Sequence, residues 1–213
     1  LHKATRPAAL PPLMVLDLGG VAEGLATAAP AAPLCWRDDP QSSLSDWVIR
    51  VETPGATGTG TYHVHKNMLA IGIRRSEYFT RLFTGAGASG LVENVQGGST
   101  ITLEASAAEA FPAFLDFMYK GELALSDASA MALLHLASYF RNPPLHNEVA
   151  KYVQCALEGE PGSDAGVRAA QVAPLFLAEA SHYTLDKAAD ACAGVCAKHL
   201  IACDPQYCVE LEP

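Results

Sequence analysis

The side chains best suited to bind a metal ion lie near the C-terminal end of the sequence. Four of them are spaced at i, i+4, i+7 and i+11 and therefore share one face of a helix: Cys192, Cys196, His199 and Cys203. Cysteine and histidine are good zinc ligands, but a single straight helix cannot place four ligands tetrahedrally around one ion. Leu185 and Leu200 occupy the same face. We therefore predict a packing face with small buried cysteines and no metal site.

Two further patterns have suitable residue types but an unsuitable context. Gly85, Gly87 and Gly90 match the G-x-G-x-x-G spacing of dinucleotide-binding proteins. That motif needs a strand before it and a helix after it, whereas here a helix precedes it and an irregular loop follows. His63 and His65 share one face of a strand without an evident third ligand, and the common motifs of hydrolases, metalloproteases and nucleotide-binding proteins are absent from the sequence. We predict no catalytic residue, no cofactor and no enzymatic activity.

Composition and charge exclude several classes of partner. Half of the 213 residues are hydrophobic and 17% are charged, as in a packed globular protein. The net charge is −9 and the only adjacent basic pair is Arg74-Arg75, so we expect neither nucleic acid nor a membrane surface as a partner. Six cysteines without a signal peptide or glycosylation sequon favour reduced thiols in an intracellular protein, cytoplasmic or nuclear. Because the chain begins at Leu1, we expect it to be a fragment of a longer protein.

The elements that could position a site begin after a long N-terminal segment. Residues 1–43 are rich in Ala, Pro and Gly, and we expect them to be mostly flexible, with one Gly-interrupted helical stretch near 18–28. Apolar alternation then predicts a strand at 48–51 and a partner strand at 61–65, joined by a Pro- and Gly-containing loop. The elements predicted next are two short helices at 66–72 and 76–83, a Gly-rich loop and a third strand at 100–103.

The helix that follows this third strand has an ambiguous start. Ser106 and Glu109 have the spacing of a capping box. Pro112 lacks the N–H that a helical residue would donate at that point. Either Ser106 caps a single turn, or the helix begins closer to Glu109.

The rest of the sequence predicts further helices. A buried helix capped by Ser126 or Asp127 is expected to reach Phe140, and Pro143-Pro144 is expected to open the next one. Residues 158–167 have the composition of a linker. The predicted elements after it form a helical hairpin, with helices at 172–183 and 185–201.

Four segments resemble the BTB/POZ domain and occur in its order. They are Ser45-Asp46-Trp47-Val48-Ile49-Arg50-Val51, Tyr62-His63-Val64-His65-Lys66-Asn67-Met68-Leu69-Ala70, Ser76-Glu77-Tyr78-Phe79 and Phe114-Leu115-Asp116-Phe117-Met118-Tyr119-Lys120-Gly121-Glu122-Leu123. We assign the domain to residues 44–157, and residues 168–213 are similar to the start of a BACK-type helical extension. The resemblance implies a mixed α+β fold, with a small three-stranded sheet packed against helices and a C-terminal helical hairpin.

The resemblance also implies that this chain joins proteins together. We expect a protein-interaction module that serves as the substrate-adaptor component of a cullin-RING ubiquitin ligase. Its partners would be a cullin scaffold, a second copy of the chain in a homodimer, and a substrate protein recognised by regions outside this sequence. The alternative is an oligomerising scaffold without a ubiquitin role, as in BTB-containing transcription regulators or assembly modules. Length and charge do not separate the two.

Two sets of residues match interaction sites of the family. Leu91-Val92-Glu93 match the hydrophobic-X-Glu motif of cullin-binding members, in the loop between the second short helix and the third strand. There the apolar residue would fill a groove on the cullin and the acid would fix orientation at the rim; the alternative is an ordinary loop with one acid. Asp46 and Lys66 match the acid and base of the charged pocket at the BTB dimer interface, where such a pair sets register. The alternative is two separately solvated charges.

Overall fold

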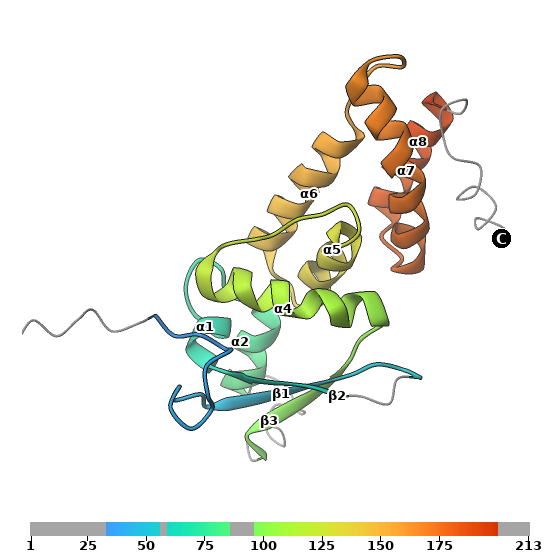
Figure 1. The fold of residues 1–213 in the computed structure, drawn as a ribbon. Coiled ribbons are helices and arrows are strands. Elements are labelled where there is room, and N and C mark those ends of the chain that lie inside the picture. The colour runs from blue at the N-terminus through green and yellow to red at the C-terminus, as the bar shows by residue number, and fades with distance from the viewer. Residues whose placement is uncertain (1–32, 56–58, 86–95, 200–213) are drawn as a thin grey trace, which may run out of the picture. The chain divides into compact units, whose positions relative to one another are not determined.

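The sheet consists of the strands that the apolar alternation predicts (Figure 1). The computed structural model describes residues 33–55, 59–85 and 96–199. Within these residues the strands are β1 (Trp47–Glu52), β2 (Thr59–Val64) and β3 (Gly98–Thr102). The central β1 pairs antiparallel with β2 and parallel with β3, which gives the order β2-β1-β3. Side chains alternate between the two faces of a strand, so Ile49 and Val51 are buried while Arg50 is exposed.

Helices begin over one face of this sheet and continue away from it (Figure 1). Their bounds in the described residues are α1 (Lys66–Ala70), α2 (Glu77–Thr84), α4 (Ala105–Lys120), α5 (Ala130–Tyr139), α6 (Pro143–Leu157), α7 (Asp164–His182) and α8 (Asp186–Lys198). Figure 1 shows α4 lying over the sheet, with α5 beyond it and the α7–α8 hairpin beside α6. The mixed α+β fold with a small sheet is therefore confirmed. None of the helices in the described part of the chain is long and apolar enough to cross a bilayer.

The core between these layers is a cluster of aromatic rings. Phe140 lies 4.8 Å from Phe114 and 5.2 Å from Phe79, measured between ring centroids. Phe111 lies 5.6 Å from Phe114 and 5.8 Å from Phe140. All four rings are fully buried. They come from α2, α4 and the C-terminal end of α5, so burying them together fixes how these helices pack on the sheet.

The predicted start of the helix near residue 106 was wrong. α4 begins at Ala105, preceded by Glu104, whose side chain makes no capping bond. The Ser106 hydroxyl instead bonds the hydroxyl of Tyr183, at the end of α7. The helix also continues through Pro112 without a break, so neither alternative drawn from that proline holds. The buried apolar side chains of α4 stabilise a helix that its local sequence disfavours.

Two other helix starts differ from expectation. α5 begins at Ala130 rather than directly after Ser126 or Asp127, because residues 127–129 form a turn in which Ser126 O accepts the amides of Ser129 and Ala130. α7 begins at Asp164, within the stretch expected to be a linker and well before residue 172. Its start is capped by Ser163, whose hydroxyl oxygen accepts the amide of Gly166 at 3.0 Å.

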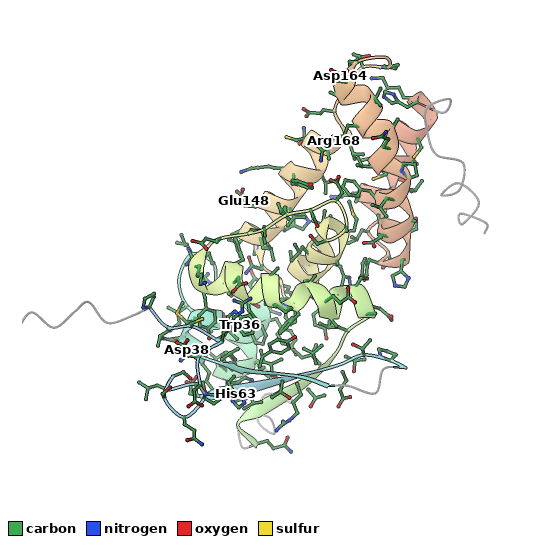
Figure 2. The ribbon with its side chains drawn as sticks, in the orientation of Figure 1. Trp36, Asp38, His63, Glu148, Asp164 and Arg168 are labelled. Atoms are coloured by element: carbon green, nitrogen blue, oxygen red, sulfur yellow. The ribbon has the colours of Figure 1, made fainter. Side chains whose placement is uncertain are left out.

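Part of the N-terminal segment expected to be flexible is held against the domain. Trp36 Nε1 donates to Asp116 Oδ1 of α4 at 3.0 Å, and the Arg37 guanidinium forms a bidentate ion pair with the same carboxylate. Figure 2 shows Trp36 beside the sheet and α4. Its ring packs edge-on against Tyr62 of β2, 5.6 Å between centroids. The ion pair with Arg37 holds the pKa of Asp116 below its usual value. The helical stretch expected near 18–28 lies outside the described residues.

Candidate functional site

The structure brings Asp46 and Lys66 together at the start of α1. Because β1 and β2 are antiparallel and pair Trp47 with Val64, the residues flanking that pair come close in space. Asp46 Oδ1 accepts the backbone N–H of Lys66 at 2.8 Å. Lys66 is the first residue of α1, so the carboxylate satisfies one of the amides that a helix N-terminus leaves unpaired.

The ammonium group of Lys66 lies over aromatic rings. Its Nζ is 4.6 Å from the ring centroid of Trp47 and 5.7 Å from that of Phe83, and the two rings meet edge-to-face at 5.0 Å. The indole N–H of Trp47 donates to Ser99 Oγ at 3.2 Å, which fixes the ring that receives the cation. Acid and base are thus neighbours in one chain, joined through a main-chain amide. Their role at a dimer interface stays a prediction.

His65, which precedes this pair, is a buried structural residue. Its Nε2 lies 2.6 Å from Ser43 O, and its Nδ1 lies 2.8 Å from the hydroxyl of Tyr119. The geometry fits a neutral ring that donates from Nε2 and accepts at Nδ1, while the Tyr119 hydroxyl also accepts the His65 amide at 2.8 Å. Burial raises the pKa of Tyr119 to about 12, so its hydroxyl keeps its proton. With both ring nitrogens in contact with protein oxygens, His65 is poorly placed to bind a metal together with His63.

The predicted cullin-binding residues Leu91, Val92 and Glu93 lie outside the described residues. The elements on either side of them are described. α2 ends at Gly85, which adopts the left-handed conformation at φ 68° that helix ends favour, and β3 begins at Gly98. Gly85, the first glycine of the G-x-G-x-x-G pattern, is thus a helix cap after α2, whereas Gly87 and Gly90 are also outside the described residues.

The Cys/His face near the C-terminus lies largely in α8. Cys192 is fully buried, Cys196 is half-buried and His199 is 5% exposed, whereas Cys203 is outside the described residues. Burial raises the pKa of the Cys192 thiol to about 12, as expected of a packed, unreactive cysteine. No group of three or more His, Cys, Asp or Glu side chains in residues 33–55, 59–85 and 96–199 is arranged to hold a metal ion.

A polar cluster that sequence reasoning missed joins the helical hairpin to the domain. Asp127 accepts from the Tyr152 hydroxyl of α6 at 2.7 Å and from Nη2 of Arg168 of α7 at 3.1 Å. Figure 2 shows Arg168 on α7. Burial, followed by the effect of Asp127, raises the pKa of Tyr152. These residues are 25 and 41 positions away from Asp127 in the sequence, so no local pattern indicates the cluster.

Two hollows lie on either side of α6. One, of about 570 Å³, is bounded by the α1–α2 connection, the end of α4 and α6, and its lining includes Ile73, Arg74 and Lys151. The other, of about 540 Å³, lies between α6 and α8; its apolar lining residues are Leu134, Ala150, Val153, Leu157, Ala188, Ala191 and Val195. Concave apolar surfaces of this kind commonly receive partner side chains.

The arrangement described above defines a protein-interaction domain, and the chain belongs to the BTB/POZ domain family. Residues 39–156, more than half of the chain, match the profile of the BTB/POZ domain. Members of this family are protein–protein interaction modules. The boundary near residue 157 and the BACK-like nature of the helices after it stay predictions.

Individual relatives agree with this assignment. Mouse BTB/POZ domain-containing protein 17 is 29% identical over 126 residues, covering 59% of this chain and 24% of the relative. Human Kelch repeat and BTB domain-containing protein 8 is 30% identical over 113 residues, covering 53% of this chain and 16% of the relative. Its Xenopus tropicalis counterpart is 33% identical over 118 residues, covering 55% and 17%. The chain thus spans a quarter or less of the length of these relatives.

Proposed function

We propose that this chain is the BTB portion of a substrate adaptor for a cullin-RING ubiquitin ligase, and that Leu91 and Glu93 contact the cullin. One observation carries the proposal. In a chain that belongs to the BTB/POZ family, Leu91-Val92-Glu93 follows α2 and precedes β3, the connection in which cullin-binding members carry a hydrophobic-X-Glu motif. Leucine would enter an apolar pocket of the partner, and the glutamate would orient it at the polar rim. Such an adaptor would act in the cytoplasm or nucleus.

The apolar groove between α6 and α8 supports a larger interface. Val153 and Leu157 line it from α6, and Ala188 and Val195 line it from α8. A cullin segment lying there would add contact area to the contact of Leu91 and Glu93, and would explain why helices follow directly after the domain. The relatives named for both Kelch repeats and a BTB domain carry further repeats in the same chain, which supports a substrate-binding region outside the sequence described here.

Isothermal titration calorimetry against the N-terminal region of the third cullin tests the proposal. We expect saturable binding with a Kd below about 1 μM, equivalent to roughly −8 kcal/mol. The double variant Leu91→Ala/Glu93→Ala should weaken binding at least about tenfold, because it removes an apolar anchor and its orienting charge. The matched control is Leu34→Ala/Glu52→Ala, which removes one exposed leucine and one exposed glutamate away from both proposed contacts.

The outcomes distinguish two questions: whether the chain binds the cullin, and whether Leu91 and Glu93 make the contact. Equal loss of affinity in both double variants, or full affinity in Leu91→Ala/Glu93→Ala, would show that the cullin does not use Leu91 and Glu93. An absence of heat at tens of micromolar from folded wild-type protein would reject the adaptor function itself.

The alternative function, an oligomerising scaffold, is favoured by a different observation. Leu44 lies two residues before Asp46 and is 82% exposed. Its φ of 58° is a left-handed backbone conformation that leucine rarely adopts. An exposed leucine beside the Asp46–Lys66 pair is a suitable centre for a homodimer contact. Analytical ultracentrifugation between 1 and 100 μM should then show a dimer that Leu44→Asp dissociates and that Val167→Asp, at a 46% exposed position on α7, leaves intact. A monomeric wild-type protein over that range rules this function out.

A further inference from the structure

The most exposed large apolar side chains of the described residues include two in a single short connection. Ile71 is 70% exposed and Ile73 is 86% exposed, in the segment between α1 and α2. Gly72 separates them at φ 91°, a backbone conformation that favours glycine. Aliphatic side chains exposed to this extent contribute nothing to the core, and Ile73 lines the 570 Å³ pocket described above.

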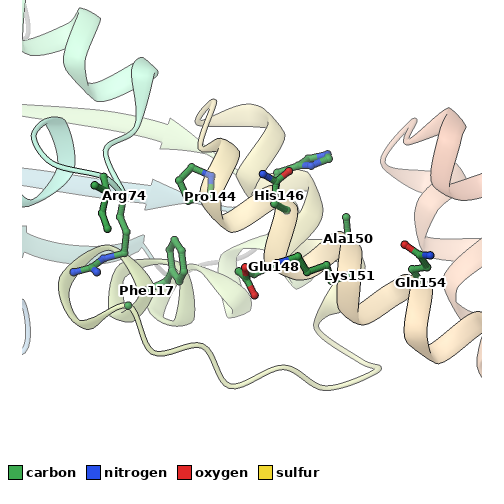
Figure 3. Close-up of a pocket in the computed structure, with 11 residues that line it drawn as sticks. Arg74, Phe117, Pro144, His146, Glu148, Ala150, Lys151 and Gln154 are labelled. Carbon is green, nitrogen blue, oxygen red and sulfur yellow. Dashed lines mark hydrogen bonds and ion pairs between the residues drawn. The ribbon is translucent and has the colours of Figure 1, made fainter.

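This pocket has an apolar floor with one anchored cation beside it (Figure 3). Phe117 of α4 and Pro144 and Ala150 of α6 supply apolar surface. The guanidinium of Arg74 reaches the end of α4, where Nε and Nη2 lie 3.5 Å and 3.4 Å from the carbonyl oxygens of Met118 and Tyr119. These are long contacts, which hold the cation at the negative end of the helix dipole.

The guanidinium of Arg74 is held in place against the C-terminal end of α4. α4 ends at Gly121, whose φ is 75°, and a Cβ at that position would lie 2.8 Å from Nη1 of Arg74. Glycine is therefore suited to the left-handed helix end, and the guanidinium of Arg74 lies directly against it. A guanidinium has five N–H donors in a planar fork that matches a carboxylate. The contacts with Met118 and Tyr119 leave donors for a second acceptor.

The charge of the pocket is opposite to that of the chain. Two of its lining residues, Arg74 and Lys151, are basic, and one, Glu148, is acidic. Glu148 already accepts from Lys151 Nζ at 2.9 Å. The chain as a whole carries −9. A positively charged pocket with an apolar floor on a negatively charged protein selects for an acidic partner with apolar side chains.

We propose that this pocket binds a segment of another protein in which an acidic residue lies beside an aliphatic or aromatic residue. The apolar side chain would contact Phe117, Pro144 and the exposed Ile73, and the carboxylate would bond Arg74 with Lys151 at the rim. This is a second interaction surface of the domain. It differs from the proposed contact of Leu91 and Glu93 with the cullin, because it uses the α1–α2 connection and the end of α4, although Ala150 of α6 lines both this pocket and the groove between α6 and α8.

Fluorescence anisotropy with a defined peptide set tests the proposal. The probes are labelled octapeptides in which glutamate or aspartate is placed next to leucine or phenylalanine in every order, and a matched set in which lysine replaces each acid. We expect micromolar binding of acidic members, no binding of the lysine set, and weakening as salt rises because the charge contact is exposed. Failure of all acidic members to bind would overturn the proposal.

Three variants locate the binding on the protein. Ile73→Asp and Lys151→Glu should each weaken peptide binding at least about fivefold, since each replaces a favourable contact with a like charge. Both side chains are highly exposed, so folding should be unaffected. The matched control is Ile71→Asp, in the same connection but outside the pocket lining; equal weakening by Ile71→Asp and Ile73→Asp would argue against the pocket. Lys187→Glu, across α6 in the groove with α8, should leave the affinity unchanged.

Ultracentrifugation of the protein alone tests whether a second copy of the chain, rather than an acidic segment of another protein, binds to this surface. If wild-type protein self-associates and Ile73→Asp abolishes that association, the surface binds a second copy of the chain and the proposed partner is wrong. A sedimentation pattern that is the same for wild type and Ile73→Asp supports the acidic segment.

Discussion

The BTB domain and the α7–α8 hairpin bury their side chains in different ways. The domain is centred on large rings, with Phe140 in contact with Phe79 and Phe114 at 5.2 Å and 4.8 Å. In the hairpin the fully buried positions of α7 are mostly small, namely Ala169, Ala170, Ala173, Ala180 and the larger Phe176. Aromatic pairs have a preferred geometry worth about 0.5–1.5 kcal/mol beyond the area they bury. The ring cluster therefore fixes orientation, whereas alanines mainly allow the two helices to approach.

The two regions also differ in how deeply their polar contacts are buried. In the domain, His65 and its partners Tyr119 and Ser43 are buried. The hairpin is joined to the preceding chain by exposed ion pairs, Arg168–Asp127 and Lys198–Glu160, whose side chains are 32% to 84% exposed. Exposed pairs of this kind contribute about 0–1 kcal/mol each. We infer that the hairpin opens at a lower free energy than the domain.

The largest expected effect comes from removing one ring from each region. Phe140→Ala should lower the free energy of unfolding by about 3–5 kcal/mol, because it leaves a cavity beside the buried rings of Phe79, Phe111 and Phe114. Phe176→Ala removes an equally buried ring from α7. We expect the loss from Phe176→Ala to be smaller and confined to the hairpin. Urea unfolding followed by circular dichroism, with hydrogen exchange to locate the opened amides, distinguishes the two.

Tyr139→Ala, at the 43% exposed neighbour of Phe140, is the control for loss of a ring at the surface, and should cost about 1 kcal/mol or less. If Phe176→Ala exposes the amides of α4 and α5 as readily as those of α8, the two regions unfold as one unit. The hairpin would then not open at a lower free energy than the domain.

Removing one tyrosine hydroxyl from each region should lower the free energy of unfolding by less than removing a ring, and again by more in the domain than in the hairpin. Tyr119→Phe removes the partner of both the amide and the Nδ1 of buried His65, and should cost about 1–3 kcal/mol. Tyr183→Phe removes the hydroxyl that bonds Ser106 between α7 and α4. We expect about 1 kcal/mol there, because the Ser106 side chain is half-buried and can turn to water. Equal losses in thermal unfolding would show that the junction is as rigid as the core.

These contrasts indicate which parts of the structure the sequence could predict. Apolar alternation placed the three strands, and apolar spacing placed the ring-bearing faces, because both follow from local periodicity. The starts of α4 and α5 were missed because their expected capping residues bond distant partners, whereas the start of α7 was missed although Ser163 caps it locally. Ser106 contacts Tyr183 and Asp127 contacts Arg168, and only the tertiary fold reveals these pairs. The proximity of Asp46 and Lys66 could be anticipated from family resemblance.

The pocket beside α6 could not be predicted in the same way. Its lining comes from the α1–α2 connection, the end of α4 and one side of α6, segments that are far apart in the sequence. No spacing rule connects Ile73 with Phe117 and Lys151. The one sequence feature near it is Arg74-Arg75, the only adjacent basic pair, and a single basic pair does not by itself indicate a pocket.

Two glycines of the hairpin should respond to alanine with opposite signs. A Cβ at Gly166 would lie 2.0 Å from the carbonyl oxygen of Glu160, so Gly166→Ala must displace backbone and should cost about 1–3 kcal/mol. Gly194 in α8 has open space at that position. Gly194→Ala should therefore stabilise the helix by about 0.5–1 kcal/mol. Melting temperatures of the two variants test this directly, and a stabilising Gly166→Ala would mean that the turn before α7 yields easily.

The smallest predicted effect is a difference in acid sensitivity between the regions. Burial, then His182, lowers the pKa of His135 on α5, whose ring stacks on Tyr183 at 4.4 Å. Its contribution to stability is complete above the unfolded value of 6.5 and is lost as pH falls below it. Arg37 lowers the pKa of Asp116 in the domain, so that contribution persists down to the ordinary value of 3.8 and is lost only below it.

Unfolding experiments between pH 8 and pH 3 should therefore show the junction of α5 and α7 weakening before the contact of Arg37 with Asp116 is lost. Each step should be less than about 1 kcal/mol, because His135 is only half-buried and Arg37 is largely exposed. His135→Gln should remove the step below pH 6.5 and keep the step below 3.8, whereas Asp116→Asn should do the reverse. His146→Gln, at an exposed position on α6, should change neither. A single acid transition unaffected by His135→Gln would show that the junction of α5 and α7 does not titrate separately from the domain.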